Sequence, residues 1–332
     1  MIAGVNKPSE SPQVTVLIVN WNGAAVLSRC LAAVFAQTYR DFEVLVVDNG
    51  STDGSADGLE DAWPGVRVVR LAENSGFAAG NNSGAALARG RWLALLNADA
   101  FPEAGWLAAL LVAAETQPDG TCFASQLVMA GDPARLDGTG DVYHASGMVW
   151  RRHYGQLAAF GQQAGEVFSP CAAAALYDRD WFLRLGGFDT ALFSYLEDVD
   201  LGFRWRLAGG RCWYVPEAVV THVGSASQGA HSAFNIYYGQ RNVTRVFVKN
   251  MPREWLALLL PLHLAVLAFF TAVYALRGQG GAVLRARWDA LRGLPQTWRD
   301  RRTVQALRTV SGWAVVRQFS WDLLALLFRS RR

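Results

Sequence analysis

The amino-acid sequence predicts an α/β fold, with a mostly parallel sheet flanked by helices and a helical region appended at the C-terminal end. Two observations lead to this prediction. Short, almost wholly apolar runs alternate with stretches whose apolar residues recur at helical spacing, as expected of repeated βα units. Each apolar run is followed by Asn, Asp, Ser or Gly, and ligands bind at the carboxyl ends of parallel strands.

The first third of the chain is expected to contain four strands separated by helices. The apolar runs do not alternate with polar residues, which indicates a sheet covered on both faces. The predicted strands are 14–19, 42–47, 66–71 and 92–96. The predicted helices are 24–36, 55–62, 78–88 and 104–116.

The pattern loosens after the fourth helix. Residues 120–169 are rich in glycine and short strands, and we expect them to shape an acceptor pocket. Regular structure returns with a helix that carries Glu197 and Asp198 and a strand over 212–215. At 332 residues the chain suits one large domain plus an appendage. The expected divisions are a lead-in over 1–13, a catalytic domain over 14–230 and a basic helical region over 231–332.

Basic charge is concentrated at the C-terminal end. Residues 277–332 contain 12 Arg and 3 Asp, a net charge of +9, so residues 1–276 carry −6 of the total of +3. This asymmetry favours an anionic partner, either lipid headgroups or nucleic acid. The four cysteines form no C-x-x-C pair, which argues against a zinc site and a disulfide framework. Residues 1–13 have no apolar segment of the kind found in secretory signals.

Four motifs, taken together and in order, are more specific than any one of them alone. They are V-N-W-N-G from Val19, V-V-D-N-G-S-T-D-G-S from Val46, L-L-N-A-D-A from Leu95 and Y-L-E-D-V-D-L-G-F-R-W-R from Tyr195. Over residues 14–250 the chain resembles the family 2 glycosyltransferases, which have the GT-A fold, and in particular their rhamnosyltransferase-like branch.

The resemblance implies an inverting transfer of a sugar from a nucleotide-sugar donor, a dTDP- or UDP-sugar, with rhamnose from dTDP-rhamnose as the expected case. The implied acceptor is a lipid-linked glycan or a polysaccharide of the cell surface. It also implies that Asp48 reads the base, since a carboxylate accepts hydrogen bonds from a pyrimidine N–H. The further donor contacts that it implies are Asn20, Asn49, Ser51, Gly76, Phe77, Asn81, Asn97 and Arg241.

Both donor motifs have a purely structural alternative. The sequence Asp-Asn-Gly-Ser from Asp48 can simply form a turn, because all four residue types favour one. The small residues over 74–81 can serve close helix–sheet packing rather than an approach to a diphosphate.

Asp99 is the expected main ligand of a divalent metal ion, Mg²⁺ or Mn²⁺, that bridges the diphosphate of the donor. The family usually has Asp-x-Asp here, and Asn97 replaces the first Asp, which leaves the metal requirement open. An Asx-turn is the alternative for Asn97 and Asp99. His222 is the second expected ligand and suits Mn²⁺ better than Mg²⁺, with a structural histidine as its alternative.

Glu197 and Asp198 are the expected catalytic pair at the start of a helix. An inverting transfer needs a general base that takes the proton of the acceptor hydroxyl as its oxygen attacks the anomeric carbon. The resemblance implies this role for the pair, and we assign the base to Asp198 and a supporting role to Glu197. The alternative is that acidic residues only favour the helix dipole at this position.

Residues 255–276 lack Asp, Glu, Lys and Arg and are long enough to cross a bilayer of about 30 Å. We expect Pro261 and His263 to interrupt them, and a basic tail and a nucleotide-sugar site both belong on the cytoplasmic side. The predicted arrangement is therefore peripheral or re-entrant at the cytoplasmic face of the inner membrane, with 313–332 as an amphipathic surface helix. The alternative is that these helices pack on one another or form a homodimer.

Two other functional classes were weighed against a transferase. The incomplete Asp-x-Asp would suit a catalytically inert subunit that binds a sugar nucleotide or a polysaccharide in an export complex. A nucleic-acid partner is not expected, because the basic tail lacks interleaved aromatic and basic residues and helix-turn-helix signals.

Overall fold

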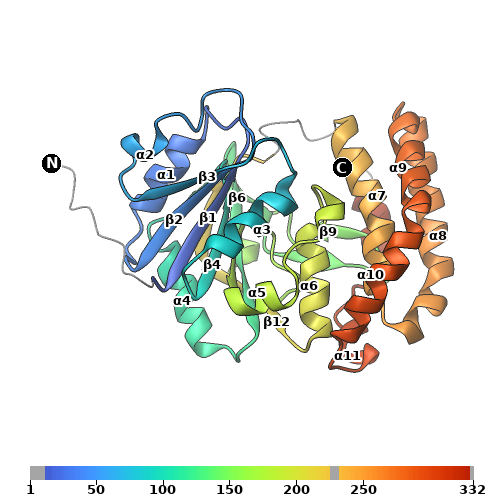
Figure 1. Ribbon diagram of the computed structural model, residues 1–332. Helices are drawn as coiled ribbons and strands as arrows, with labels where there is room; N and C mark the ends of the chain where they lie inside the picture. Colours follow the sequence, from blue (N-terminus) through green and yellow to red (C-terminus); the bar gives the residue numbers. More distant parts are fainter. Residues whose placement is uncertain (1–11, 225–231, 330–332) are drawn as a thin grey trace.

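The computed structural model describes residues 12–224 and 232–329 and confirms the predicted α/β fold (Figure 1). The described residues form one ten-stranded sheet and a separate hairpin of β8 (Asp141–Tyr143) and β9 (Val149–Arg151). The strands of the large sheet are β1 (Val14–Asn20), β2 (Phe42–Asp48), β3 (Val66–Arg70), β4 (Trp92–Asn97), β5 (Ala100–Pro102), β6 (Thr121–Met129), β7 (Asp132–Gly138), β10 (Gly165–Glu166), β11 (Ala174–Asp178) and β12 (Arg211–His222).

The strand order places a parallel unit at one side of the sheet. The order is β10-β12-β6-β11-β4-β1-β2-β3, with β5 paired to β12 and β7 paired to β6. Strands β4, β1, β2 and β3 are parallel, so their carboxyl ends lie at one edge. Strand β11 is antiparallel to both β4 and β6, and β12 is parallel to β6. The sheet is therefore mixed, with its parallel part where the sequence predicted it.

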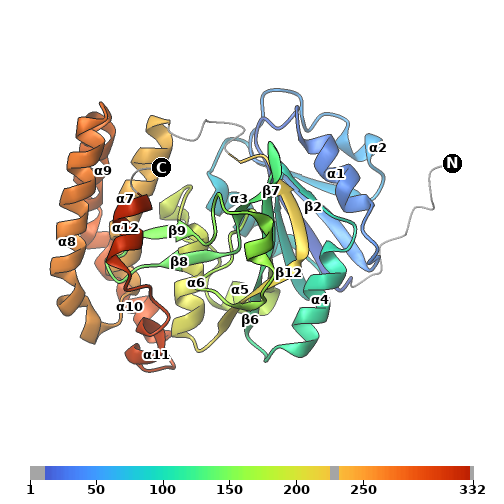
Figure 2. The ribbon, with the colours of Figure 1, turned by 180° about the vertical axis from the view of Figure 1, so that it is seen from behind.

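Helices cover both faces of the sheet (Figures 1 and 2). On one face α1 (Leu27–Phe35) and α4 (Trp106–Thr116) pack on side chains such as Val16 and Ile18. On the other face α3 (Phe77–Leu87), α5 (Arg179–Arg184) and α6 (Glu197–Leu207) pack on side chains such as Leu17. Alternate residues of β1 thus belong to two cores, which explains the unbroken apolar run in the sequence.

Two predicted elements have different bounds in the structure. The helix expected over 55–62 is limited to α2 (Leu59–Ala62), because Gly54 and Gly58 have φ values of 75° and 61° and turn the chain before it. The strand expected over 212–215 continues as β12 through a bulge between Val215 and Val219.

The C-terminal region is helical and lies against α6 and the β8–β9 hairpin (Figures 1 and 2). Its helices are α7 (Ala233–Asn250), α8 (Arg253–Leu276), α9 (Gly280–Arg292), α10 (Leu294–Ala306), α11 (Gly312–Val316) and α12 (Leu323–Arg329). A third core joins it to the α/β part, for example Phe203 of α6 with Phe247 of α7 and Leu259 of α8. Helices α8 and α9 form the outer edge.

The predicted interruption of the apolar segment is wrong, because α8 runs through Pro261 as one helix. Pro261 lies on the exposed side, and the helix continues without the hydrogen bond that the missing N–H of proline would donate. His263 points inward instead. Its Nδ1 lies 2.7 Å from the carbonyl oxygen of Ser146, and its ring stacks on Phe247 with 4.0 Å between centroids.

The single amphipathic helix predicted over 313–332 is also wrong. It is divided into α11 and α12, since residues 317–322 run back along β8. Phe319 is buried against Tyr143, and the N–H of Ser320 donates to the Tyr143 carbonyl at 2.8 Å. Residues 330–332 of that segment, and residues 1–11 of the predicted lead-in, lie outside the described residues.

Candidate functional site

A cavity of about 490 Å³ opens where the carboxyl ends of the parallel strands meet the start of α6. This is the edge of the sheet at which the polar strand ends gather. Eight of the predicted site residues line it. These are Asn49, Gly76, Phe77, Asn97, Asp99, Glu197, Asp198 and His222.

Asn49 fixes the loop that leads from β3 into α3. Its Nδ2 donates to Asn74 Oδ1 at 3.1 Å and to the Gly76 carbonyl at 3.2 Å. Its Oδ1 accepts the backbone N–H of Ser75 at 3.0 Å. Gly76 precedes α3 with a φ of 88°, a value that residues other than glycine rarely adopt. As a result, small groups of this loop border the cavity.

Asn20, Asp48 and Ser51 do not line the cavity. Asn20 Nδ2 donates to Asp48 Oδ1 at 3.4 Å and to Ser51 Oγ at 3.1 Å. The backbone N–H of Ser51 donates to the same Asp48 oxygen at 3.3 Å. These contacts join the ends of β1 and β2 beside the cavity.

Asn81 and Arg241 also lie outside the lining. Asn81 Nδ2 donates to the Phe77 carbonyl at 2.9 Å within α3. Arg241 Nη2 donates to the carbonyl groups of Ala191 and Leu192 at 2.8 and 2.9 Å. Both side chains therefore donate hydrogen bonds to backbone carbonyl groups near the cavity.

Asp99 and His222 face each other in the cavity wall. His222 Nε2 lies 3.4 Å from Asp99 Oδ1, and His222 Nδ1 lies 2.7 Å from Asp137 Oδ2. Asp137 is also paired with Arg151. Burial disfavours the charged form of Asp99, but the hydrogen bond and charge of His222 outweigh it and lower the pKa of Asp99. Burial also disfavours the charged form of His222, which by itself would lower its pKa. The hydrogen bonds with Asp137 and Asp99 have the larger effect and raise the pKa of His222.

The groups around Asp99 fit a divalent cation. They combine a carboxylate, an imidazole and Asn97 Oδ1, which is buried without a hydrogen-bond partner. The contact between Asp137 and His222 is of the kind that orients a metal-binding imidazole. Within residues 12–224 and 232–329, no three His, Cys, Asp or Glu side chains group as metal ligands, so a bound diphosphate would have to complete the coordination.

Glu197 and Asp198 begin α6 at another wall of the cavity. The Ala172 N–H donates to Asp198 Oδ2 at 3.0 Å, and the Val199 N–H donates to Oδ1 at 2.8 Å. Burial raises the pKa of Asp198, and these two hydrogen bonds limit the rise. Burial and the charge of Asp198 raise the pKa of Glu197 well above its usual value. Asp198 is therefore the carboxyl group that ionises more readily.

Sequence reasoning missed part of the cavity. The residues concerned are Trp21, Asp141, Trp150, Arg151, Phe193 and Tyr195. Asp141 and Arg151 are partners in the β8–β9 hairpin, within a stretch whose sequence has no readable period. Trp21 stands within the V-N-W-N-G motif and Tyr195 at the start of the Glu-Asp motif, and these positions were the available signals.

Comparison with known proteins identifies the family. The model of the family described as Glycosyl transferase family 2 matches residues 15–186. The chain belongs to this family. This glycosyltransferase is 30% identical over 270 residues to the N-acetylglucosaminyl-diphospho-decaprenol L-rhamnosyltransferase of Mycobacterium tuberculosis, covering 72% of this chain and 85% of that protein.

Solved structures share the GT-A fold with the glycosyltransferase. GalNAc-T7 with UDP, GalNAc and Mn²⁺ superposes with a TM-score of 0.60 at 20% identity, covering 74% of this chain and 49% of that chain. A mannosyltransferase from Pyrobaculum calidifontis in complex with GDP-Man and Mn²⁺ superposes with a TM-score of 0.55 at 21% identity, covering 97% of this chain and 90% of that chain.

Proposed function

We propose that the protein transfers a deoxyhexose, L-rhamnose from dTDP-rhamnose, with inversion onto a lipid-linked glycan acceptor. The observation that carries the proposal is that Asp99 and His222 share one cavity with Glu197 and Asp198. A diphosphate site and a general base are the two parts that an inverting transfer needs. The 30% identical rhamnosyltransferase supports the choice of sugar and of a diphosphate-lipid acceptor.

The donor binds along the ends of the parallel strands. Its nucleoside lies near Trp21 and Asn49, and its diphosphate extends towards Asn97, Asp99 and His222. Asp48 accepts a hydrogen bond from Asn20, and this contact holds the end of β2 next to the place where the nucleoside binds. This places the anomeric carbon towards Glu197 and Asp198.

Asp198 takes the proton from the acceptor hydroxyl. Two backbone N–H groups fix both of its oxygens, and each oxygen keeps a lone pair for the acceptor. Glu197 has a pKa well above its usual value, because it is buried beside Asp198. Of the two carboxyl groups Glu197 is therefore the less readily ionised, so we assign the negative charge needed for proton transfer to Asp198.

Asp99, His222 and the Asn97 side chain would hold a divalent cation. A bound cation supplies neutralisation of the charge that grows on the leaving nucleoside diphosphate. Asp137 keeps the imidazole of His222 turned towards Asp99. Mn²⁺ in both solved relatives supports the proposal for this chain.

We also propose that the enzyme sits at the cytoplasmic face of the plasma membrane through α8 and α9. Within the described ranges, α8 is the one helix that is long and apolar enough to cross a bilayer, and 28% of its apolar window is buried. Its outward residues include Leu258 and Leu264. On α9, Leu284, Trp288 and Leu291 are exposed at helical spacing. Exposed Arg side chains on α9 favour contact with anionic lipid headgroups.

The test is release of dTDP from dTDP-rhamnose on addition of a polyprenyl-diphosphate-linked N-acetylglucosamine, with Mn²⁺ present. We expect acceptor-dependent release and a product longer by one deoxyhexose, detected by mass spectrometry. Binding of dTDP without turnover, across UDP-, GDP- and dTDP-sugars and glycan acceptors, would instead favour an inert binding subunit. Co-sedimentation with anionic but not neutral vesicles tests the location separately.

A further inference from the structure

The segment Phe193–Leu196, which leads into α6, has an unusual backbone. Phe193, Tyr195 and Leu196 have φ values of 64°, 69° and 69°, and Phe193 combines its φ with a ψ of −60°. Residues other than glycine rarely adopt such conformations, so three within four positions must be held by their surroundings. All four residues of the segment line the cavity, directly before Glu197.

Asn242 of α7 holds this segment. Its side chain is fully buried. Its Nδ2 donates to the carbonyl groups of Leu192, Ser194 and Tyr195 at 3.0, 2.9 and 2.7 Å. The two N–H bonds of one amide group thereby serve three carbonyl groups within four residues of the chain. Arg241 donates to Asn242 Oδ1 at 2.9 Å and so fixes the orientation of the amide.

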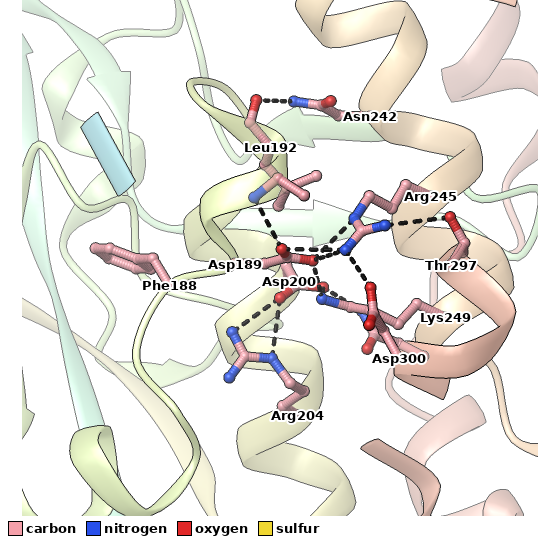
Figure 3. A network of polar contacts seen from close by, with 12 residues as sticks. Phe188, Asp189, Leu192, Asp200, Arg204, Asn242, Arg245, Lys249, Thr297 and Asp300 are labelled. Atoms are coloured by element: carbon pink, nitrogen blue, oxygen red, sulfur yellow. Dashed lines mark hydrogen bonds and ion pairs between the residues drawn. The ribbon is translucent and has the colours of Figure 1, made fainter. Parts of the chain in front are cut away.

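Further side chains of α7 hold the chain before and after the segment (Figure 3). Asp189, which precedes the segment, accepts hydrogen bonds from Arg245 at 2.9 Å and from Lys249. Lys249 Nζ also lies 2.7 Å from Asp200 Oδ1, two residues beyond Asp198 in α6. Asn242 thus acts between two anchored ends, and the charged groups of the network are paired with one another.

The other side of the segment contacts residues 74–76 of the loop that leads from β3 into α3, here called the donor loop because the proposed donor lies along it. A Cβ atom on Gly76 would lie 2.6 Å from Phe193 Cδ2 and 2.7 Å from the Phe193 carbonyl oxygen, so only glycine fits. The Ala78 N–H donates to that carbonyl at 3.4 Å. Phe193 also stacks on Tyr238, with 5.2 Å between ring centroids. The segment therefore lies between the donor loop and the catalytic carboxyl groups.

We propose that Asn242 is a positioning residue, which locks Phe193–Leu196 so that Phe193 and Tyr195 form the wall that receives the acceptor sugar beside Asp198. This inference rests on the proposed function for the identity of the acceptor. Aromatic side chains of a cavity wall offer flat apolar faces on which a sugar ring can pack. Asn242 is not among the residues that line the cavity, and its side chain bonds to Arg241, to Leu192 and to the segment, so it acts on the reaction through the segment.

The test compares Asn242→Asp with Thr244→Val in the full-length protein. Aspartate has the shape of asparagine but places a carboxylate against three carbonyl groups and cannot donate to them. Thr244 is a matched control, because it lies on the same helix, is buried, and has a hydroxyl without a hydrogen-bond partner. We expect Asn242→Asp to lower kcat and raise the acceptor KM, each about tenfold or more, while thermal protection by dTDP stays within twofold of wild type. Thr244→Val should match wild type throughout.

Hydrogen exchange of the amides over 190–197 gives a readout that needs no substrate. We expect exchange about tenfold faster or more in Asn242→Asp, and unchanged in Thr244→Val. Should Asn242→Asp fail to fold, Arg241→Gln supplies the second variant, with the same pattern at smaller amplitude. A lower Tm with unchanged kcat, acceptor KM and segment exchange, measured well below unfolding, would overturn the proposal. An inactive wild-type enzyme with faster exchange in Asn242→Asp would count against the proposed function and leave the positioning role supported.

Discussion

The proposed donor wall and the proposed acceptor wall of the cavity are built in different ways. The donor wall consists of residues at the ends of strands, such as Asn49 and Asn97, and a regular parallel sheet positions them. The acceptor wall, Phe193–Leu196, has a strained backbone that α7 holds through Asn242, about fifty residues later in the chain. The donor wall therefore depends on the sheet alone, whereas the acceptor wall also depends on the C-terminal helices.

The largest effect is expected from Asp198→Asn, which removes the proposed base beside the acceptor wall. General base catalysis contributes about 10²–10⁴-fold, so transfer should fall by that factor. Donor binding should be kept, because the donor wall is untouched. Nucleoside diphosphate release measures the first effect and thermal protection by dTDP the second. Asp180→Asn, at an exposed site on α5, is the control and should behave as wild type. Unchanged transfer in Asp198→Asn would show that another group is the base.

A smaller effect is expected from Asp137→Asn, which acts on the donor wall. Asp137 orients His222, and the loss of such a contact typically weakens metal binding by about 10–100-fold. Mn²⁺ titration of transfer activity measures the change, and activity should recover at high Mn²⁺ concentration. Asp132→Asn, exposed on β7, is the comparison. An unchanged Mn²⁺ titration would remove His222 from the metal site.

Gly76→Ala tests the junction at which the two walls meet. The added methyl group would clash with Phe193, and the φ of 88° would strain alanine as well. We expect the free energy of unfolding to fall by about 1–3 kcal/mol and both dTDP binding and transfer to weaken. Chemical denaturation and dTDP titration measure these quantities. In Gly105→Ala the new methyl group meets nothing within 4 Å, so its effect should be small. Loss of transfer with intact dTDP binding would show that the walls are independent.

The smallest expected effect is a pH shift in Arg151→Gln. Burial raises the pKa of Asp198, and the charge of Arg151 opposes the rise. Because the ionised base is active, kcat/KM should fall as the pH drops through this raised pKa. Removal of Arg151 should move this fall in kcat/KM, the acid limb of the pH profile, to higher pH. Arg211→Gln, exposed at the start of β12, should leave the limb in place. A limb that moves to lower pH would contradict the assignment of Asp198.

The cavity residues at the strand ends are easier to predict from the sequence than Phe193–Leu196, and the reason is physical. Polar residues that follow buried strands, such as Asn49 and Asp99, lie at the same edge of the sheet because the carboxyl ends of parallel strands meet there. Arg151 reaches the cavity only because the β8–β9 hairpin folds against α6, and no local pattern encodes that contact. The continuity of α8 through Pro261 likewise depends on which side of the helix is exposed.

The spacing of the holding residues on α7 has a consequence for its length. Asn242, Arg245 and Lys249 recur at three and four residues, so they occupy one face of the helix. One residue inserted between Asn242 and Arg245 would rotate them by about 100° relative to each other. The charged anchors and the amide could then no longer engage the chain ahead of α6 together. The contacts of these three side chains therefore fix the number of residues between them on α7.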